Sequence, residues 1–478
     1  MLFNSFEFLL FFIIVTVLFF VLPHKYRWFH LLLASCIFYM AFVPVYIFIL
    51  FGTIIIDYFA GILIERSSGS RRKRLLIISL ISNIGVLAVF KYYNFFLDNI
   101  NTLAGVDAGR SVLPYLHMLL PIGLSFHTFQ AMSYTIEVYR GKQPAEKHFG
   151  IYALYVMFYP QLVAGPIERP QHVLPQFHQE KFFNAEDFFI GFKFMLWGMF
   201  KKVVIADRLA ILVNQVYGNP QQYNSTMLFV ATVFFAVQIY CDFSGYSSIA
   251  IGTARVLGFR LMQNFENPYR SKTISEFWKR WHISLSSWFR DYLYIPLGGN
   301  KVSVPRWYFN LFLVFLISGL WHGANWTFLI WGALHGFYLV FAIVTQKPRK
   351  FLTKSIGLSK LPGVYNWLQV LSTFLLVTFA WIFFRSESVN DSFYIIKKIF
   401  SNDWKSLQVE ETFPKFSYIL SLGLIIFLFI AENKFVDRII NNKLEENKAQ
   451  NLVFGTAVLS LILVLGVFQK LSFIYFQF

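Results

Sequence analysis

The stretch NLFLVFLISGLWHGANWTFLIWGALHGFYLVFAIV, which runs from Asn310 to Val344, decides the fold class of this chain. It contains no Asp, Glu, Lys or Arg, and His322 lies between its two strongly apolar halves. Apolar runs of this kind suit helices that cross a hydrocarbon core about 30 Å thick. The stretch therefore predicts membrane helices with a histidine between them.

The same apolar character extends over all 478 residues, of which 56% are hydrophobic, 20% aromatic and only 14% charged. A soluble protein carries roughly 25% charged residues. This composition excludes a disordered chain, a fibre and a small disulfide-rich scaffold, and it predicts an all-α polytopic membrane protein. The runs expected to cross or enter the membrane are Phe6–Leu22, Trp28–Phe42, Tyr46–Ile64, Leu75–Phe96, Phe149–Val163, Phe188–Phe200, Met227–Phe243, Tyr308–Leu320, Trp326–Val344, Tyr365–Phe384, Ser417–Ala431 and Leu452–Phe468. Some of these are short, so we expect re-entrant or tilted segments among them.

The net charge of +17 does not indicate nucleic-acid binding, because the basic residues stand between apolar runs and orient the chain in the membrane. Basic residues follow the first run and the third run, and the loop Thr345–Lys360 is basic without any acid. By the positive-inside rule these loops are cytoplasmic, so the N-terminus and the C-terminus are expected outside the cytoplasm.

We expect one membrane domain over residues 1–478, with N-terminal helices in 1–112, a core in 113–344 and C-terminal helices in 345–478. Its two cysteines, Cys36 and Cys241, are expected to be small buried side chains.

The least apolar long stretch lies between Asp242 and Asn300. From Arg255 to Arg306 it holds nine Lys and Arg against three acids, which predicts a basic cytoplasmic surface. Apolar side chains at helical spacing predict one amphipathic helix from Ile274 to Tyr292, and His282 falls at the edge of its aromatic face. Two interpretations of His282 stay open: an interfacial histidine bonded to a backbone carbonyl, or an inward histidine beside a basic patch that admits a phosphate-bearing cofactor.

Two polar positions near that stretch have local interpretations. Thr273 and Glu276 fit a helix capping box. Asp242 follows an apolar run, and as a helix-end carboxylate it would pair with a nearby cation such as Arg255.

His322 is the ionisable residue at apparent membrane depth. A charge there is costly, so its imidazole should be neutral and able to act as a general base. Asn325 and Trp326 would share its helix face if the helix continues, whereas His335 is too far along a straight helix to join it. No HExxH or GxSxG motif occurs, which argues against a metal site and a serine hydrolase. A structural histidine and a transporter proton relay remain alternatives.

The segments PIGLSFHTFQAMSYTIEVYRG (Pro121–Gly141) and YPQLVAGPIERP (Tyr159–Pro170) are polar and interrupted by Gly and Pro. At membrane depth such backbone is tolerated only where it lines a cavity or is buried in protein. The two segments therefore suggest an internal polar chamber.

These two segments, together with QIYCDFSGYSSIAIG, FWKRWHISLSSWFRDYLYIPLGGN and SGLWHGANWTFLIWGALHG, occur in the order typical of one family. The chain resembles the membrane-bound O-acyltransferase family over nearly its full length, in particular the bacterial branch that acetylates polysaccharides such as alginate. The resemblance implies about 11 transmembrane helices, with re-entrant and interfacial helices, around a central tunnel.

The resemblance also implies the chemistry. His322 corresponds to the second histidine of the family pair, which acts as general base. His282 corresponds to the upstream polar partner, also expected to be catalytic, which would orient or polarise the thioester from the cytoplasmic side. The donor would be acetyl-CoA or another acyl thioester, with no permanently bound cofactor and no metal. A periplasmic SGNH-type partner is expected to complete transfer to the sugar. The residues expected to bind the donor or acceptor are Trp278, Lys279, Arg280, Trp281, Asp242, Asn325 and Trp326.

Three alternatives stay open at this point. One is a D-alanyl transferase of teichoic acid synthesis, which requires an acyl carrier protein. The others are a transporter with His322 as relay and a scaffold of a polysaccharide export complex.

Overall fold

The structure is a computed structural model that describes residues 1–106, 111–117, 121–163, 165–401, 403–408, 413–432, 448–468 and 473–476. The described part is built from helices and contains no β-strand. The predicted all-α fold class is therefore confirmed.

The chain forms two compact units, each assembled from separate stretches of sequence. The first unit contains Met1–Leu196 and Tyr246–Met262, and the second contains Trp197–Gly245 and Gln263–Phe478. The helices up to the boundary of the first unit are α1 (Phe6–Val21), α2 (His24–Met40), η1 (Pro44–Tyr46), α3 (Ile47–Arg66), α4 (Gly69–Leu87), η2 (Ala88–Tyr92), α5 (Tyr93–Leu103), α6 (Leu124–Tyr139), α7 (Phe149–Met157), α8 (Tyr159–Leu162), α9 (Pro170–His178) and α10 (Ala185–Met199).

The remaining helices begin in the second unit, and α12 supplies its last turns to the first. They are η3 (Phe200–Ala206), α11 (Asp207–Gly218), η4 (Pro220–Gln222), α12 (Ser225–Val256), η5 (Pro268–Arg270), α13 (Ile274–Arg280), α14 (Ile283–Phe289), η6 (Arg290–Tyr294), α15 (Val304–His322), α16 (Trp326–Val344), α17 (Gln346–Ser355), η7 (Leu358–Lys360), α18 (Pro362–Arg385), α19 (Val389–Ile399), α20 (Lys415–Ala431), α22 (Lys448–Leu465) and η8 (Ile474–Phe476).

Six helical segments in the described residues are long and apolar enough to cross a membrane. They are Pro44–Arg66, Gly69–Leu103, Ser225–Val256, Val304–His322, Trp326–Val344 and Pro362–Arg385. Three shorter apolar helices, Phe6–Val21, Lys415–Ala431 and Ala449–Leu465, also coincide with predicted runs.

Both cysteines are free thiols. Cys241 is buried as expected, whereas Cys36 is only partly buried.

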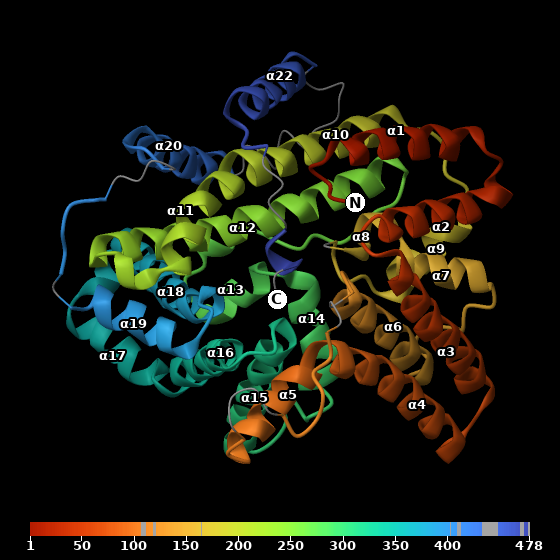
Figure 1. Ribbon diagram of the computed structural model, residues 1–478, viewed down its shortest axis with the longest axis horizontal. Helices are drawn as coiled ribbons and strands as arrows, with labels where there is room; N and C mark the ends of the chain where they lie inside the picture. Colours follow the sequence, from red (N-terminus) through yellow and green to blue (C-terminus); the bar gives the residue numbers. More distant parts are fainter. Residues whose placement is uncertain are drawn as a thin grey trace. The chain divides into compact units, whose positions relative to one another are not determined.

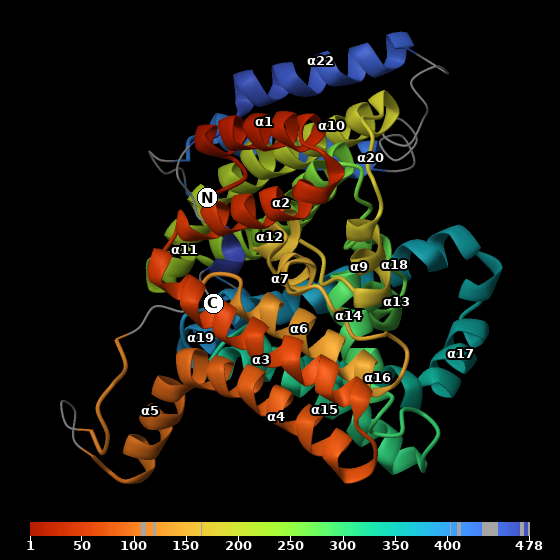
Figure 2. The same ribbon diagram turned by 90° about the vertical axis from the view of Figure 1, so that its right-hand side faces the viewer.

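In the first unit, α6 packs against α3 and α4 (Figure 2). The polar segment that α6 carries is buried in protein: His127 Nε2 lies 2.7 Å from Thr53 Oγ1, and Gln130 Nε2 donates to the carbonyl of Tyr155 at 2.5 Å. Tyr155 in turn donates to the carbonyl of Glu168, at 3.1 Å. Tyr155 thus links the two predicted segments, and Arg169 Nη1 of the second also donates to Ser133 Oγ of the first at 3.4 Å. Their polar groups are hydrogen-bonded, as burial at membrane depth requires.

In the second unit, α15 and α16 lie side by side as an antiparallel pair (Figure 1). Glycines permit this close approach. A Cβ added at Gly319 would lie 2.3 Å from the carbonyl oxygen of Phe328, and one at Gly332 would lie 2.3 Å from that of Phe315. Small residues of this kind let membrane helices pack backbone against backbone. The packing fixes the position of the last turn of α15, which carries His322.

The predicted single helix from Ile274 to Tyr292 is wrong, because α13 ends at Arg280 and α14 begins at Ile283. Tertiary hydrogen bonds account for the break. The carbonyl of Arg280 accepts from the backbone N–H of Glu266 at 2.9 Å, and the N–H of Ile283 donates to the carbonyl of Asn264 at 2.9 Å. These bonds use backbone groups that a continuous helix would pair internally. The predicted cap at Thr273 is present, since its hydroxyl accepts from the Glu276 N–H at 3.1 Å.

Candidate functional site

His322 lies in the interior of the second unit. Its side chain is 4% exposed. The ring centroid lies 4.9 Å from that of Trp331 on α16 and 5.2 Å from that of Phe384 on α18. Immediately after it, a Cβ at Gly323 would lie 2.1 Å from the Phe328 ring, so the chain turns there with no room for a side chain. His322 is therefore enclosed by aromatic rings from the two following membrane helices.

His282 lies at the break between α13 and α14, with left-handed backbone angles of φ 43 and ψ 56. It is fully buried, and its Nδ1 lies 3.1 Å from Asn264 Oδ1. The same oxygen accepts from the backbone N–H of Ser284 at 3.2 Å, which identifies this Asn264 atom as the acceptor. His282 Nδ1 therefore donates, and the neutral ring keeps its lone pair at Nε2. Burial lowers the pKa of His282 from 6.5 to about 3, which favours this uncharged ring.

Tyr475, in the short turn η8, lies between the two histidines. Its ring centroid is 5.7 Å from that of His322 and 6.4 Å from that of His282. It also lies 4.4 Å from the ring of Phe243 on α12. Sequence reasoning missed Tyr475, because no periodicity or motif relates it to residues more than 150 positions earlier.

The C-terminal turn is held by Asp242, which accepts from the backbone N–H of Ile474 at 2.8 Å. Asp242 also pairs with the buried Lys202, at 2.7 Å. The predicted pairing of Asp242 with Arg255 is wrong, since Arg255 pairs with Asp187. Asp242 and Arg255 lie on one continuous helix, so 13 residues separate them by about 20 Å. Asp242 therefore anchors the turn that carries Tyr475.

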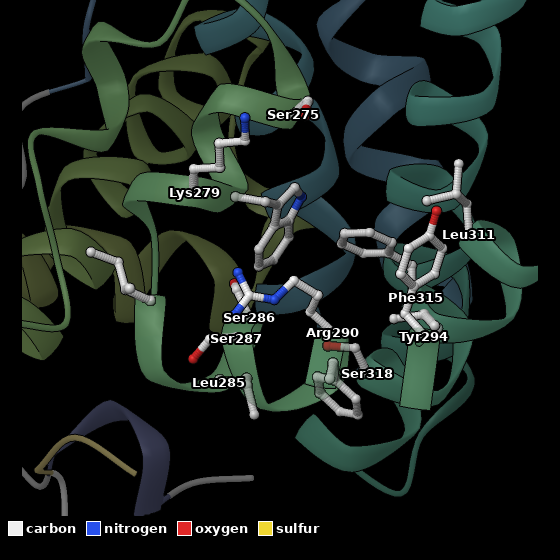
Figure 3. A pocket seen from close by; sticks show the side chains of 14 residues that line it. Ser275, Lys279, Leu285, Ser286, Ser287, Arg290, Tyr294, Leu311, Phe315 and Ser318 are labelled. Carbon is white, nitrogen blue, oxygen red and sulfur yellow. The ribbon is translucent and has the colours of Figure 1, made fainter. Parts of the chain in front are cut away.

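A pocket of about 300 Å³ opens among α13, α14, η6 and α15 (Figure 3). Trp278 and Phe315 contribute aromatic wall, and Lys279 and Arg290 contribute two cationic side chains. Arg290 is also paired with Asp291 at 2.8 Å. Ser318, one helical turn before His322, lines the pocket as well. Much of the pocket wall is thus apolar, and two cationic side chains line it. The pocket adjoins the last turns of α15.

Two of the residues predicted to bind the donor, Trp278 and Lys279, line this pocket, but Arg280 and Trp281 do not. Arg280 pairs with Glu276 one turn before it, at 2.8 Å. Trp281 is buried, with its ring 5.2 Å from that of Trp381. Arg280 still belongs to α13 but pairs with Glu276 outside the pocket lining, whereas Trp281 follows the end of α13 and no longer keeps its periodicity.

Asn325 and Trp326 do not share a helix face with His322, because α15 ends at His322. Asn325 is the N-cap of α16, and its Oδ1 accepts from the backbone N–H of Thr327 at 3.0 Å. Its Nδ2 donates to the carbonyl of Glu387 at 2.9 Å. Trp326 is 54% exposed. The structure therefore places Asn325 in helix capping and Trp326 at the surface of the unit.

Comparison with known proteins places these residues in a family. The sequence model of the membrane-bound O-acyltransferase family matches residues 144–385. A probable alginate O-acetylase AlgI of Pseudomonas aeruginosa is 39% identical over 406 residues, which cover 84% of this chain and 75% of that protein. The chain belongs to the membrane-bound O-acyltransferase family. It is therefore an acyltransferase and a multi-pass integral membrane protein.

Two other relatives show the range of acceptors within this membrane-bound O-acyltransferase family. A peptidoglycan O-acetyltransferase of Helicobacter pylori is 36% identical over 395 residues, 77% of this chain and 72% of that protein. A teichoic acid D-alanyltransferase of Bacillus subtilis is 29% identical over 238 residues, 45% of this chain and 56% of that protein. The family match includes His282, His322 and the whole pocket, whereas Tyr475 lies beyond it.

Proposed function

We propose that this acyltransferase moves an acetyl group from a cytoplasmic thioester to a hydroxyl on the extracytoplasmic side, for acetylation of a cell-surface polysaccharide. The observation that carries the proposal is the arrangement of His322 and His282 around Tyr475 in a buried aromatic cluster. The names of the alginate and peptidoglycan relatives support acetyl transfer to a polysaccharide.

In this proposal the neutral imidazole of His322 is the general base. It takes the proton of the acceptor hydroxyl as the hydroxyl oxygen attacks the thioester carbonyl carbon. The new C–O bond forms, the C–S bond breaks, and the proton passes from the imidazolium to the departing thiolate. Water is excluded by the aromatic rings around His322, which favours transfer to the hydroxyl over hydrolysis.

His282 orients the donor. Its Nδ1–H is directed at Asn264, so the ring offers a lone pair at Nε2 rather than a proton. Such a nitrogen accepts a hydrogen bond from an amide N–H of the donor, or from the thiol once the acetyl group has left it. It does not polarise the thioester carbonyl, because that step requires a hydrogen-bond donor.

The pocket beside α15 is the proposed donor site. Lys279 and Arg290 provide cations for phosphate groups, and the walls formed by Trp278 and Phe315 suit an apolar arm. Acetyl-CoA combines phosphates with such an arm and a terminal thioester. The donor is a substrate in this scheme, and no permanently bound cofactor is required.

We place the protein in the cytoplasmic membrane with both chain ends outside the cytoplasm. The basic loops, such as Thr345–Lys360, support this orientation. A tunnel enclosed by the helices would bring the donor from the cytoplasm to His322, and the acceptor would enter from the other face. An SGNH-type partner outside the cytoplasm is expected to pass the acetyl group to the polysaccharide.

The test is CoA release from acetyl-CoA by the purified full chain, with a soluble carbohydrate acceptor. We expect His322→Ala to lower release by roughly 10²–10⁴-fold, the usual contribution of a general base. The exposed His117 provides a matched control, and His117→Ala should keep wild-type release. Release that survives His322→Ala, in protein with an unchanged unfolding temperature, would remove His322 from the role of base.

The alternatives give different results in the same assay. A D-alanyl transferase would use a D-alanyl carrier protein and ignore acetyl-CoA. A transporter or an export scaffold would release a free thiol from neither donor.

A further inference from the structure

His335 is a fully buried histidine on α16 that the proposed mechanism does not use. Its Nδ1 accepts a hydrogen bond from the indole N–H of Trp278, at 3.2 Å. An indole nitrogen can only donate, so Nδ1 of His335 is unprotonated and a neutral ring carries its hydrogen on Nε2. The bond joins α16 to α13, two helices 57 positions apart in sequence at these residues.

Trp278 is part of the wall of the proposed donor pocket. Its ring also packs against Phe315, at 5.1 Å, and against Trp331, at 5.7 Å. Ring packing alone leaves an indole free to turn over, because either edge buries similar area. The hydrogen bond to His335 distinguishes the two orientations and fixes which edge of the indole faces the pocket.

His335 also lies next to the candidate base through one shared ring. The centroid of Trp331 is 5.0 Å from that of His335 and 4.9 Å from that of His322. Trp278, His335, Trp331 and His322 therefore form a continuous row of ring contacts from the pocket wall to the base.

We propose that His335 is a positioning residue that fixes the indole of Trp278, and thereby the donor-pocket wall, relative to His322. This inference rests on the proposed function, since it takes the pocket to hold the thioester donor. His335 touches neither the pocket nor the reacting atoms, so its effect on the reaction passes through Trp278.

A role in packing alone makes a different prediction. A leucine at position 335 keeps an apolar, similarly sized side chain but removes the acceptor. An asparagine keeps an acceptor oxygen near the place of Nδ1 but loses ring contacts. If His335 contributes packing alone, His335→Asn should raise the donor KM more than His335→Leu does. If His335 positions Trp278, His335→Leu should raise it more.

The experiment measures CoA release against acetyl-CoA concentration for the full chain with His335→Leu, His335→Asn, Trp278→Phe and the double variant Trp278→Phe with His335→Leu. We expect His335→Leu and Trp278→Phe each to raise KM for the donor roughly fivefold to twentyfold, the effect of one lost hydrogen bond, with kcat within about twofold. The KM of the double variant should not exceed the higher KM of the two single variants, since both substitutions remove the same bond. His335→Asn should stay close to wild type.

Tyr338→Phe is the matched control. The Tyr338 ring lies on the same helix with its centroid 5.8 Å from that of His335, and removal of its hydroxyl leaves the bond between His335 and Trp278 in place, so KM should be unchanged. Unchanged KM in His335→Leu, multiplicative effects in the double variant, or equal effects of Asn and Leu would each overturn the inference. If His335→Leu fails to fold, Trp278→Phe and His335→Asn still give opposite predictions. A wild-type protein that releases no CoA contradicts the proposed function and this inference together, whereas normal wild-type release with unaltered variants contradicts this inference alone.

Discussion

The two candidate histidines reach the interior by different backbone routes. His322 is the last residue of a membrane helix, whereas His282 occupies a left-handed position between two short helices. His322 closes α15 and His282 is the N-cap of α14, so the chain changes direction at both histidines. The two histidines are 40 positions apart in sequence, and tertiary packing around Trp321 and Tyr475 brings them into one cluster.

A pH dependence follows from the burial of His282. Its folded-state pKa is about 3, below the value of 6.5 for an exposed histidine, so between these values the unfolded chain binds more protons. The stabilisation is therefore full above pH 6.5 and declines by about 1.4 kcal/mol per pH unit as the pH falls toward 3. We expect the unfolding temperature of wild type to drop more steeply between pH 6.5 and 4.5 than that of His282→Asn. Parallel pH profiles would contradict this assignment.

The cations of the pocket give a second prediction at this scale. Replacement of Lys279 and Arg290 by Gln together should raise the KM for acetyl-CoA roughly tenfold, because two charge-assisted contacts to phosphate are lost. The kcat should change little, since neither side chain touches the histidines among the contacts of the described residues. Lys301→Gln with Arg306→Gln removes the same charge from exposed positions outside the pocket lining and should have no effect. Equal KM values for the two double variants would show that only net charge matters.

At the scale of elements, the contact between α15 and α16 determines where His322 lies. Gly332→Ala should lower stability by about 1–3 kcal/mol, because its Cβ would clash with the carbonyl oxygen of Phe315. Gly363→Ala on α18 is the control, since nothing lies within 4 Å of its added Cβ, and it should leave stability unchanged or higher. Thermal unfolding of the two variants measures the difference, and equal unfolding temperatures would refute close packing at Gly332.

The membrane helices could be predicted from sequence, because apolar composition and length are local properties. The break at Trp281 and His282 could not, since eight apolar residues at helical spacing favour a continuous helix while the bonds to Asn264 and Glu266 come from a separate segment. For the same reason His322 and Trp278 could be proposed from the sequence, whereas Tyr475 and the Asp242 anchor could not, because their contacts join positions far apart in the chain.

At the scale of the whole molecule, the distribution of basic residues predicts the orientation in the membrane. Single cysteines can test this in a background without Cys36 and Cys241. Ser359→Cys, in the basic loop, should react with a membrane-impermeant maleimide only in inverted vesicles, whereas Ser401→Cys should react on intact cells. Both serines are exposed in the structure. Labelling of both from the same side would contradict the predicted orientation.

The left-handed backbone at position 282 allows the requirements of folding and of catalysis at this residue to be tested separately. Glycine and asparagine adopt such angles readily, whereas β-branched and bulky residues rarely do. A library with every amino acid at this codon, sorted only for membrane-inserted protein, should retain Gly and Asn beside His. Sorting the same library for cells with acetylated surfaces should retain His alone. Residues retained by the first sort and lost in the second would show that the imidazole at position 282 is required for catalysis rather than for folding.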